Sequence, residues 1–202
     1  MPPVSSPRTV VAAIVGIAGL VGAAGAGVAG ASTHAAPAAT PLKVVTATRI
    51  TRRPGTLAPG TRIRAAGLFG QRVFTDAKHG FALASAIDAD YPVPTADGGK
   101  TWRTNGPALH LHAAQAPLAV TFIGAINRQT EFAWGGGQVI DATSNGGKTW
   151  YSALFTQGGP LAVARDVAGR LVALIGSSGS ATWEYRSTDG GRSWHYLGAV
   201  RP

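Results

Sequence analysis

Three short segments of this sequence repeat the same polar residue types at the same spacing, and their chemistry could be catalytic or structural. TADGGKTW, TSNGGKTW and STDGGRSW each carry a hydroxyl, then a carboxylate or carboxamide two residues later, then two glycines and a closing tryptophan. A carboxylate beside a hydroxyl can move protons in an active site. The same two groups can also bond to nearby backbone amides and close a tight turn.

The middle copy favours the structural alternative. It has Asn145 where the other copies have Asp97 and Asp189. A carboxamide keeps the acceptor oxygen that a turn needs, but it cannot act as a general acid or base. The two glycines supply backbone dihedral angles that other residues avoid, and the tryptophan is large enough to seal the turn. We therefore predict three structural turns and no catalytic carboxylate among them.

The distance between the copies predicts the surrounding architecture. Asp97, Asn145 and Asp189 lie 48 and 44 residues apart, a period typical of four-stranded propeller blades. Runs that alternate apolar and polar residues flank each copy, as in hairpins. Pro92 and Pro94 make the third strand of the first repeat short or an edge strand. Over residues 65–202 we predict an all-β, β-propeller-type array of four-stranded antiparallel blades, three of which are recognisable.

The repeated segments resemble the Asp-box, also called the BNR repeat, of sialidases, sortilin-type receptors and the Ycf48-like photosystem II assembly factors. The matching residues are Thr95, Asp97, Gly99, Thr101 and Trp102; Thr143, Asn145, Gly147, Thr149 and Trp150; and Ser187, Asp189, Gly191, Ser193 and Trp194. The Ycf48-like group is the most similar, because the paired glycines and the run Phe74–Ala82 also match. The resemblance implies that each box joins the third and fourth strands of a blade, and that the chain contacts another protein.

Three blades are fewer than the four to eight of ordinary propellers, so ring closure has three alternative explanations. Leu42–Gly70 could form a degenerate fourth blade, or the strand that closes one. Two chains could combine their blades as a homodimer. The array could also stay open and leave apolar sheet surfaces for a partner to cover.

Residues 1–31 have the features of an export signal. MPPVSSPR carries one positive charge, and the 23 residues from Thr9 to Ala31 carry none. The pattern predicts a cleaved signal peptide, or an uncleaved hydrophobic helix that anchors the chain in the membrane through residues 9–31. Both alternatives make the remaining domain secreted or extracytoplasmic. Residues 32–64, rich in Pro, Ala and Arg, are predicted to be a linker.

A group of arginines without any acidic residue lies within this predicted linker. Its members are Arg49, Arg52, Arg53, Arg62 and Arg64. They could bind an anionic partner, such as an acidic protein or an envelope component, or they could simply be solvated. Nucleic acid is not an expected partner, because no aromatic residues alternate with these arginines and the chain has an export signal.

Other site chemistry has little support in the sequence. Cysteine is absent, which excludes disulfides, thiolate metal sites and a cysteine nucleophile. His110 and His112 lie on one face of a predicted strand without a third ligand nearby. We therefore expect neither a metal nor a cofactor.

A sialidase-like glycoside hydrolase or a glycan-binding lectin is the alternative function that the resemblance implies. Such a hydrolase would pair a tyrosine nucleophile with a glutamate, but Glu184 and Tyr185 are neighbours on a predicted strand and should point to opposite faces. We therefore interpret the chain as an exported, non-catalytic binding or scaffold module that mediates protein–protein contact in the cell envelope.

Overall fold

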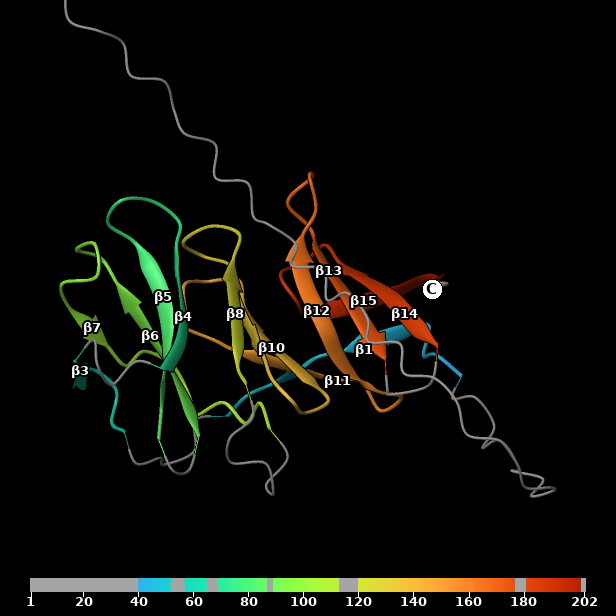
Figure 1. Cartoon of the computed structure of the whole chain (residues 1–202), viewed down its shortest axis with the longest axis horizontal. Helices are drawn as coiled ribbons and strands as arrows, with labels where there is room; N and C mark the ends of the chain where they lie inside the picture. Colours follow the sequence, from blue (N-terminus) through green and yellow to red (C-terminus); the bar gives the residue numbers. More distant parts are fainter. Residues whose placement is uncertain are drawn as a thin grey trace, which may run out of the picture. The chain divides into compact units, whose positions relative to one another are not determined.

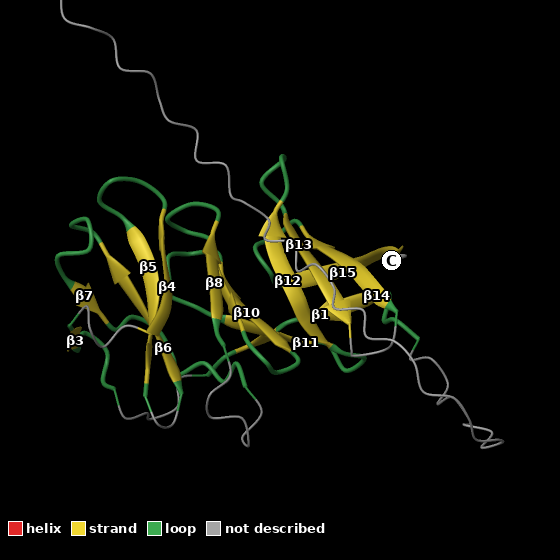
Figure 2. Ribbon diagram, viewed as in Figure 1, coloured by secondary structure: helices red, strands yellow, loops and turns green. Residues whose placement is uncertain are grey.

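The protein is described by a computed structural model that covers residues 40–51, 57–64, 69–86, 89–112, 120–176 and 181–200. The chain divides into two compact units, residues 1–35 and 36–202, and every described residue belongs to the second. The described residues form antiparallel β-sheets and no helix (Figures 1 and 2), which confirms the all-β prediction. The predicted export signal and hydrophobic helix at residues 1–31 lie outside the described residues.

Two of the sheets have five antiparallel strands each. The middle sheet has the order β2 (Thr48–Arg49), β11 (Tyr151–Leu154), β10 (Val139–Thr143), β9 (Glu131–Trp134) and β8 (Phe122–Ala125). The last sheet has the order β1 (Val44–Thr46), β15 (Ser193–Val200), β14 (Thr182–Ser187), β13 (Leu171–Gly176) and β12 (Gly159–Arg165). Each contains the four predicted strands of its repeat, together with one additional strand from the N-terminal segment.

The first repeat is divided into two smaller sheets. One contains β4 (Phe69–Phe74), β5 (Gly80–Ser85) and β6 (Asp90–Thr95), and the other contains β3 (Arg62–Ile63) and β7 (Trp102–Arg103). The Pro92 carbonyl accepts a hydrogen bond from the Asn105 amide on the side of β7. Pro92 and Pro94 have no N–H to donate on that same side, so no ladder joins β6 to β7. The prediction of an edge strand at these prolines is confirmed.

The N-terminal segment pairs with all three repeats, in reverse order along the chain. β1 pairs with β15, β2 with β11 and β3 with β7, each antiparallel. We call the described residues from β1 to β3 the strap. The linker prediction is wrong for these residues, because they form strands that pair with the repeats. The described part of residues 42–70 does not form a separate fourth blade. Its strands cover the unpaired backbone groups at the last strand of each repeat.

The strap also completes the core beside each box tryptophan. Val45 lies directly opposite Trp194 and Ile63 directly opposite Trp102, while the Ile50 amide donates to the Trp150 carbonyl oxygen. Each pair belongs to one hydrophobic cluster. The three tryptophans are almost completely buried. Among the described residues the sheets close neither into a barrel nor into a propeller ring, so the propeller architecture stays a prediction.

Candidate functional site

The first and last boxes close their turns with the same set of hydrogen bonds. In the first box, the Thr101 amide and hydroxyl donate to the two oxygens of Asp97 at 2.9 and 2.6 Å. In the last box, Ser193 donates to Asp189 at the same two distances. The indole N–H of each closing tryptophan, Trp102 and Trp194, donates to a glycine carbonyl within its own turn. These polar groups therefore serve their own turns.

The middle box forms the same turn, but two of its hydrogen-bond donors lack the partners that their counterparts have. The Thr149 amide donates to Asn145 Oδ1 at 2.9 Å. The second side-chain atom of Asn145 is an NH₂ group, which cannot accept a hydrogen bond from the Thr149 hydroxyl. The buried indole nitrogen of Trp150 also has no hydrogen-bond partner among the described residues. Asn145 therefore leaves the Thr149 hydroxyl without the bond that its counterparts make, and the Trp150 indole separately lacks the glycine bond of the other two boxes.

The boxes lie at one end of the sheets, together with the turns that follow β4, β8 and β12. In an antiparallel sheet the first and third turns share one end, and the Gly98 amide accordingly donates to the Lys78 carbonyl. Two side chains link successive sheets at this end: Arg128 Nε lies 2.8 Å from Asp76 Oδ2, and Arg165 Nη1 lies 3.4 Å from the Ile126 carbonyl oxygen. We call this region the box end.

Acidic groups at the box end are all engaged in local contacts. Thr101 hydrogen bonds hold the pKa of Asp97 far below its ordinary value, and His79 does the same for Asp76. The Arg170 amide lowers the pKa of Asp166. Burial pushes the pKa of Asp189 upward, but hydrogen bonds from its own turn more than offset this effect. All four carboxylates therefore remain ionised and are bound by their own turns, and Asp76 is also paired with Arg128 of the next sheet.

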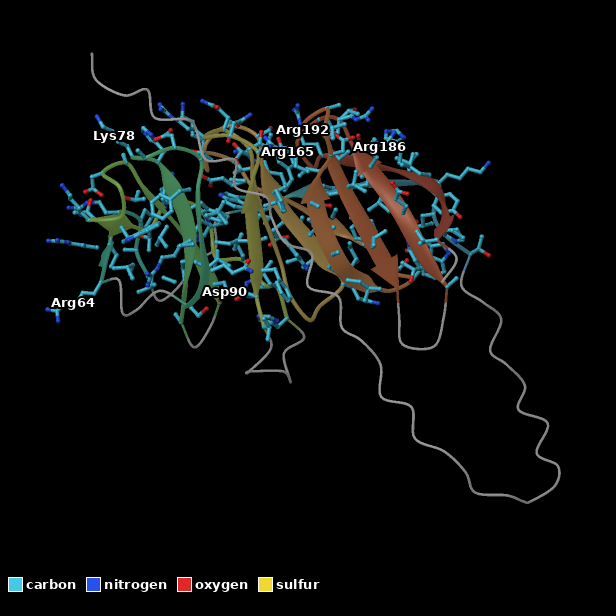
Figure 3. The ribbon with its side chains drawn as sticks, turned by 45° about the horizontal axis from the view of Figure 1, so that its top comes forward. Arg64, Lys78, Asp90, Arg165, Arg186 and Arg192 are labelled. Atoms are coloured by element: carbon cyan, nitrogen blue, oxygen red, sulfur yellow. The ribbon has the colours of Figure 1, made fainter. Side chains whose placement is uncertain are left out.

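Several cations at the same end are not paired with these carboxylates. Lys78, Lys100, Lys148, Arg165 and Arg192 form no ion pair with any residue that the structure describes. Figure 3 shows Lys78, Arg165, Arg186 and Arg192 along one edge, with Arg64 and Asp90 along the opposite edge. The box end therefore presents net positive charge drawn from all three repeats.

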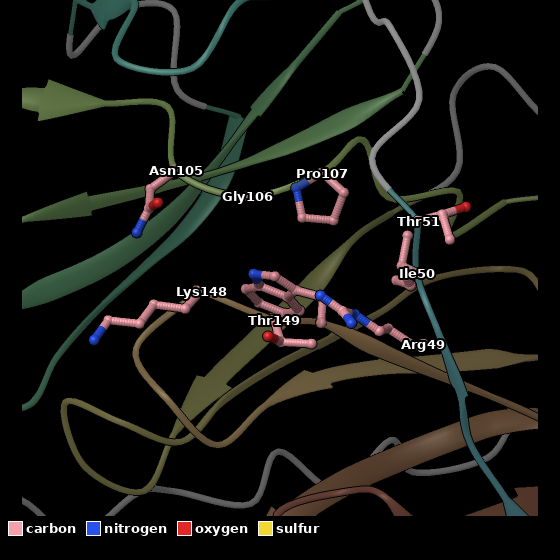
Figure 4. A pocket seen from close by; sticks show the side chains of 10 residues that line it. Arg49, Ile50, Thr51, Asn105, Gly106, Pro107, Lys148 and Thr149 are labelled. Atoms are coloured by element: carbon pink, nitrogen blue, oxygen red, sulfur yellow. The ribbon is translucent and has the colours of Figure 1, made fainter.

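A groove follows the strap at Arg49–Thr51, between the first repeat and the middle sheet. One cavity of about 540 Å³ is lined by Arg49, Ile50, Thr51, Asn105, Gly106, Pro107, Gly147, Lys148, Thr149 and Trp150. A second cavity of about 410 Å³ shares Arg49–Thr51 and adds Thr48, Ala108, His110, Val139, Asp141 and Ser152. Figure 4 shows Lys148, Thr149 and Arg49 on one side of the first cavity and Asn105, Gly106 and Pro107 on the other.

Two buried carboxyl groups of the middle sheet are perturbed in the opposite direction from the box carboxylates. Burial raises the pKa of Asp141 from 3.8 to about 7, although a hydrogen bond from Ser152 opposes the change. Burial likewise raises the pKa of Glu131 from 4.5 to about 8. Asp141 lines the second cavity of the groove, and its Oδ1 has no partner among the described residues.

The structure separates the arginines that the sequence grouped. Arg49 is on β2 and lines both cavities, whereas Arg62 and Arg64 lie at β3. Arg52 and Arg53 lie outside the described residues. Sequence analysis missed Lys148, Thr149 and Asn105 as groove residues, because three distant segments form the groove. The one signal in the sequence was Asn145, which marks the middle box as different.

The remaining candidate residues are the two histidines and the neighbours Glu184 and Tyr185. His112 Nε2 lies 3.7 Å from Asp90 Oδ2 and its Nδ1 accepts the Gly136 amide, while His110 is exposed. The described residues contain no group of three His, Asp or Glu side chains suited to a metal ion. Along β14 burial alternates, with Glu184 half-buried and Tyr185 buried, so these side chains point to opposite faces as predicted.

A comparison with protein-family models found no match, and comparisons with curated proteins and with solved structures found no similar chain. The resemblance to Asp-box proteins therefore rests on the three boxes and the run Phe74–Ala82, and it stays a prediction. The described part of the chain also contains no helix with the length and hydropathy that a membrane crossing requires.

Proposed function

We propose that this chain is an exported, non-catalytic binding or scaffold module of propeller type, and that it uses its box end to contact an acidic protein in the cell envelope. The observation that carries the proposal is the distribution of charge at that end. Its carboxylates are held by their own turns or paired with Arg128, while five cations from the three repeats form no ion pair with a described residue. Such a surface attracts an acidic partner and orients its approach.

Apolar side chains among these cations favour a protein over a simple polyanion. Phe74, at the end of β4, is 47% exposed, and Val167, in the turn after β12, is completely exposed. Protein interfaces combine apolar contacts with a charged rim, whereas a polyanion would require cations alone. The sheets supply a frame for such a contact, because strands of the strap pair with all three repeats.

Site-specific photo-crosslinking in producing cells tests this proposal. A photoreactive residue placed at Lys100 should capture an acidic extracytoplasmic protein, identified by mass spectrometry. The triple variant K78Q/R165Q/R192Q should lose most of this product, because it removes unpaired cations from the first and the last repeat. The matched control is Arg64→Gln, which removes a cation at the opposite edge and should retain the product. An equal yield from the triple variant would contradict the proposal.

A further inference from the structure

The middle box and the strap together build a polar cavity with an excess of hydrogen-bond donors. Arg49 and Lys148 supply two cations, and neither forms an ion pair with a described residue. No acidic residue lines this cavity. A guanidinium group and an ammonium group that share an acid-free cavity suit a carboxylate ligand, since charge-assisted hydrogen bonds are the stronger ones.

The two donors without a partner in the middle box, the Thr149 hydroxyl and the Trp150 indole N–H, belong to residues that line the same cavity. Thr149 lines it, and its hydroxyl makes none of the bonds that Thr101 and Ser193 make to their box carboxylates. Trp150 also lines it, and the completely buried indole N–H has no partner within the described residues. An unpaired buried donor carries a free-energy cost that a bound acceptor would remove.

Gly106 separates the cavity from that indole nitrogen. A Cβ atom at Gly106 would lie 2.9 Å from Trp150 Nε1, and Gly106 has a φ of 126° that other residues rarely adopt. Glycine therefore keeps the space above the indole nitrogen free of side-chain atoms.

The length of the groove indicates a peptide rather than a single ion. The two cavities share the lining residues Arg49–Thr51, and each far exceeds the volume of one carboxylate. Their chemistry also changes along the groove, from the cations of the first cavity to Val139 and Asp141 in the second. An extended peptide can present an acidic side chain to the first cavity and backbone N–H groups to the Asp141 carboxyl.

We infer that this groove binds an extended acidic peptide segment, whose carboxylates pair with Arg49 and with Lys148 and accept from the Thr149 hydroxyl. The inference rests on the proposed binding function and adds to the box-end surface a second site with its own chemical class of ligand. The Asp-to-Asn change in the middle box then has a functional consequence, because it frees the Thr149 hydroxyl for the ligand.

Selection from a phage library of random linear peptides tests the inference, with the full chain in a neutral detergent as the target. Enriched peptides should share an Asp or a Glu. Replacing that residue by Asn or Gln should lower affinity about tenfold or more, the usual cost of one charge-assisted hydrogen bond. The protein variant R49Q/K148Q should show a similar loss. Its melting temperature should stay unchanged, because both side chains are exposed.

The control K78Q/R192Q makes the same change of charge outside the groove and should retain full peptide affinity. Enriched peptides without an acidic residue, or equal binding by R49Q/K148Q, would overturn the inference, and so would the absence of any enrichment. The two proposals fail separately. A crosslink that persists in K78Q/R165Q/R192Q contradicts the box-end contact but does not affect peptide binding in the groove.

Discussion

The backbone amide of Ile50 donates a hydrogen bond to the carbonyl oxygen of Trp150 over 2.9 Å. Ile50 belongs to the strap and Trp150 closes the middle box, so this bond joins the N-terminal segment to the turn that distinguishes the middle repeat. Val45 and Ile63 make the corresponding contacts with Trp194 and Trp102. The strap is therefore an integral part of the fold, and it also forms one wall of the groove.

Replacing Val45 by alanine should lower the free energy of unfolding by about 1–3 kcal/mol, as for other buried aliphatic side chains shortened to alanine. Val45 is only 4% exposed and packs in the cluster that contains Trp194. The matched control is Val44→Ala on the same strand, where the side chain is 47% exposed and the change should stay within about 0.5 kcal/mol. Urea unfolding measures both variants, and equal effects would contradict a structural role for the strap.

The two threonine hydroxyls of the first and middle boxes should respond differently to removal. Thr101→Val should destabilise the protein by about 1–2 kcal/mol, because it removes the 2.6 Å hydrogen bond to Asp97 Oδ2. Thr149→Val should change stability by less than about 0.5 kcal/mol, because its hydroxyl serves no such bond. Thr149→Val should nevertheless weaken binding of the acidic peptides. Thermal unfolding and peptide titration of both variants separate the two roles.

Strands that belong to the repeats could be predicted from the sequence, because each is a local run of alternating apolar residues beside a glycine turn. β10 and β14 lie where the runs before the second and third boxes predicted them. The strap could not be predicted in this way. β1 and β2 are only three and two residues long. The strands with which they pair, β15 and β11, are distant in the sequence, so no local pattern predicts β1 or β2.

The groove illustrates the same limit at the level of a site. Arg49 was identified through charge, but its neighbours Lys148 and Asn105 come from two other segments that only the folded sheets bring together. Asn145 was interpreted from sequence as evidence for a structural turn. The hydrogen bonds of the three boxes add a second consequence, since only the comparison of Thr149 with Thr101 reveals a free hydroxyl.

Packing between the last box and the middle sheet should make Gly191 sensitive to substitution. A Cβ atom there would lie 2.5 Å from the Cβ of Ala142, which is backbone-fixed and cannot move aside. Gly191→Ala should cost about 1–2 kcal/mol for its left-handed backbone and about 1–3 kcal/mol more for the overlap. Gly169 has a similar positive φ but open space around it. Gly169→Ala is therefore the control that isolates the backbone cost, and equal losses would argue against this packing.

The opposite pKa changes of the box and core carboxyls predict a stability that peaks in the weakly acidic range. The pKa of Asp97 lies below its ordinary value, so its ionised form stabilises the folded protein and this contribution is lost as pH falls below about 4. The pKa of Asp141 is raised to about 7. The unfolded chain therefore ionises this carboxyl first, and the free energy of unfolding falls as pH rises from about 4 to about 7. Glu131 extends that fall to about pH 8.

Urea unfolding across this pH range, with isosteric variants, measures both arms of the curve. Asp141→Asn should flatten the fall between about pH 4 and pH 7 and should stabilise the protein at about pH 8 by more than roughly 1 kcal/mol, since no charge then has to be buried. Glu131→Gln should flatten the part nearest neutral pH. Asp97→Asn should alter only the acidic arm. A wild-type curve that rises steadily from pH 4 to pH 8 would contradict the burial of uncharged Asp141, and with it the carboxyl that the groove offers to a peptide N–H.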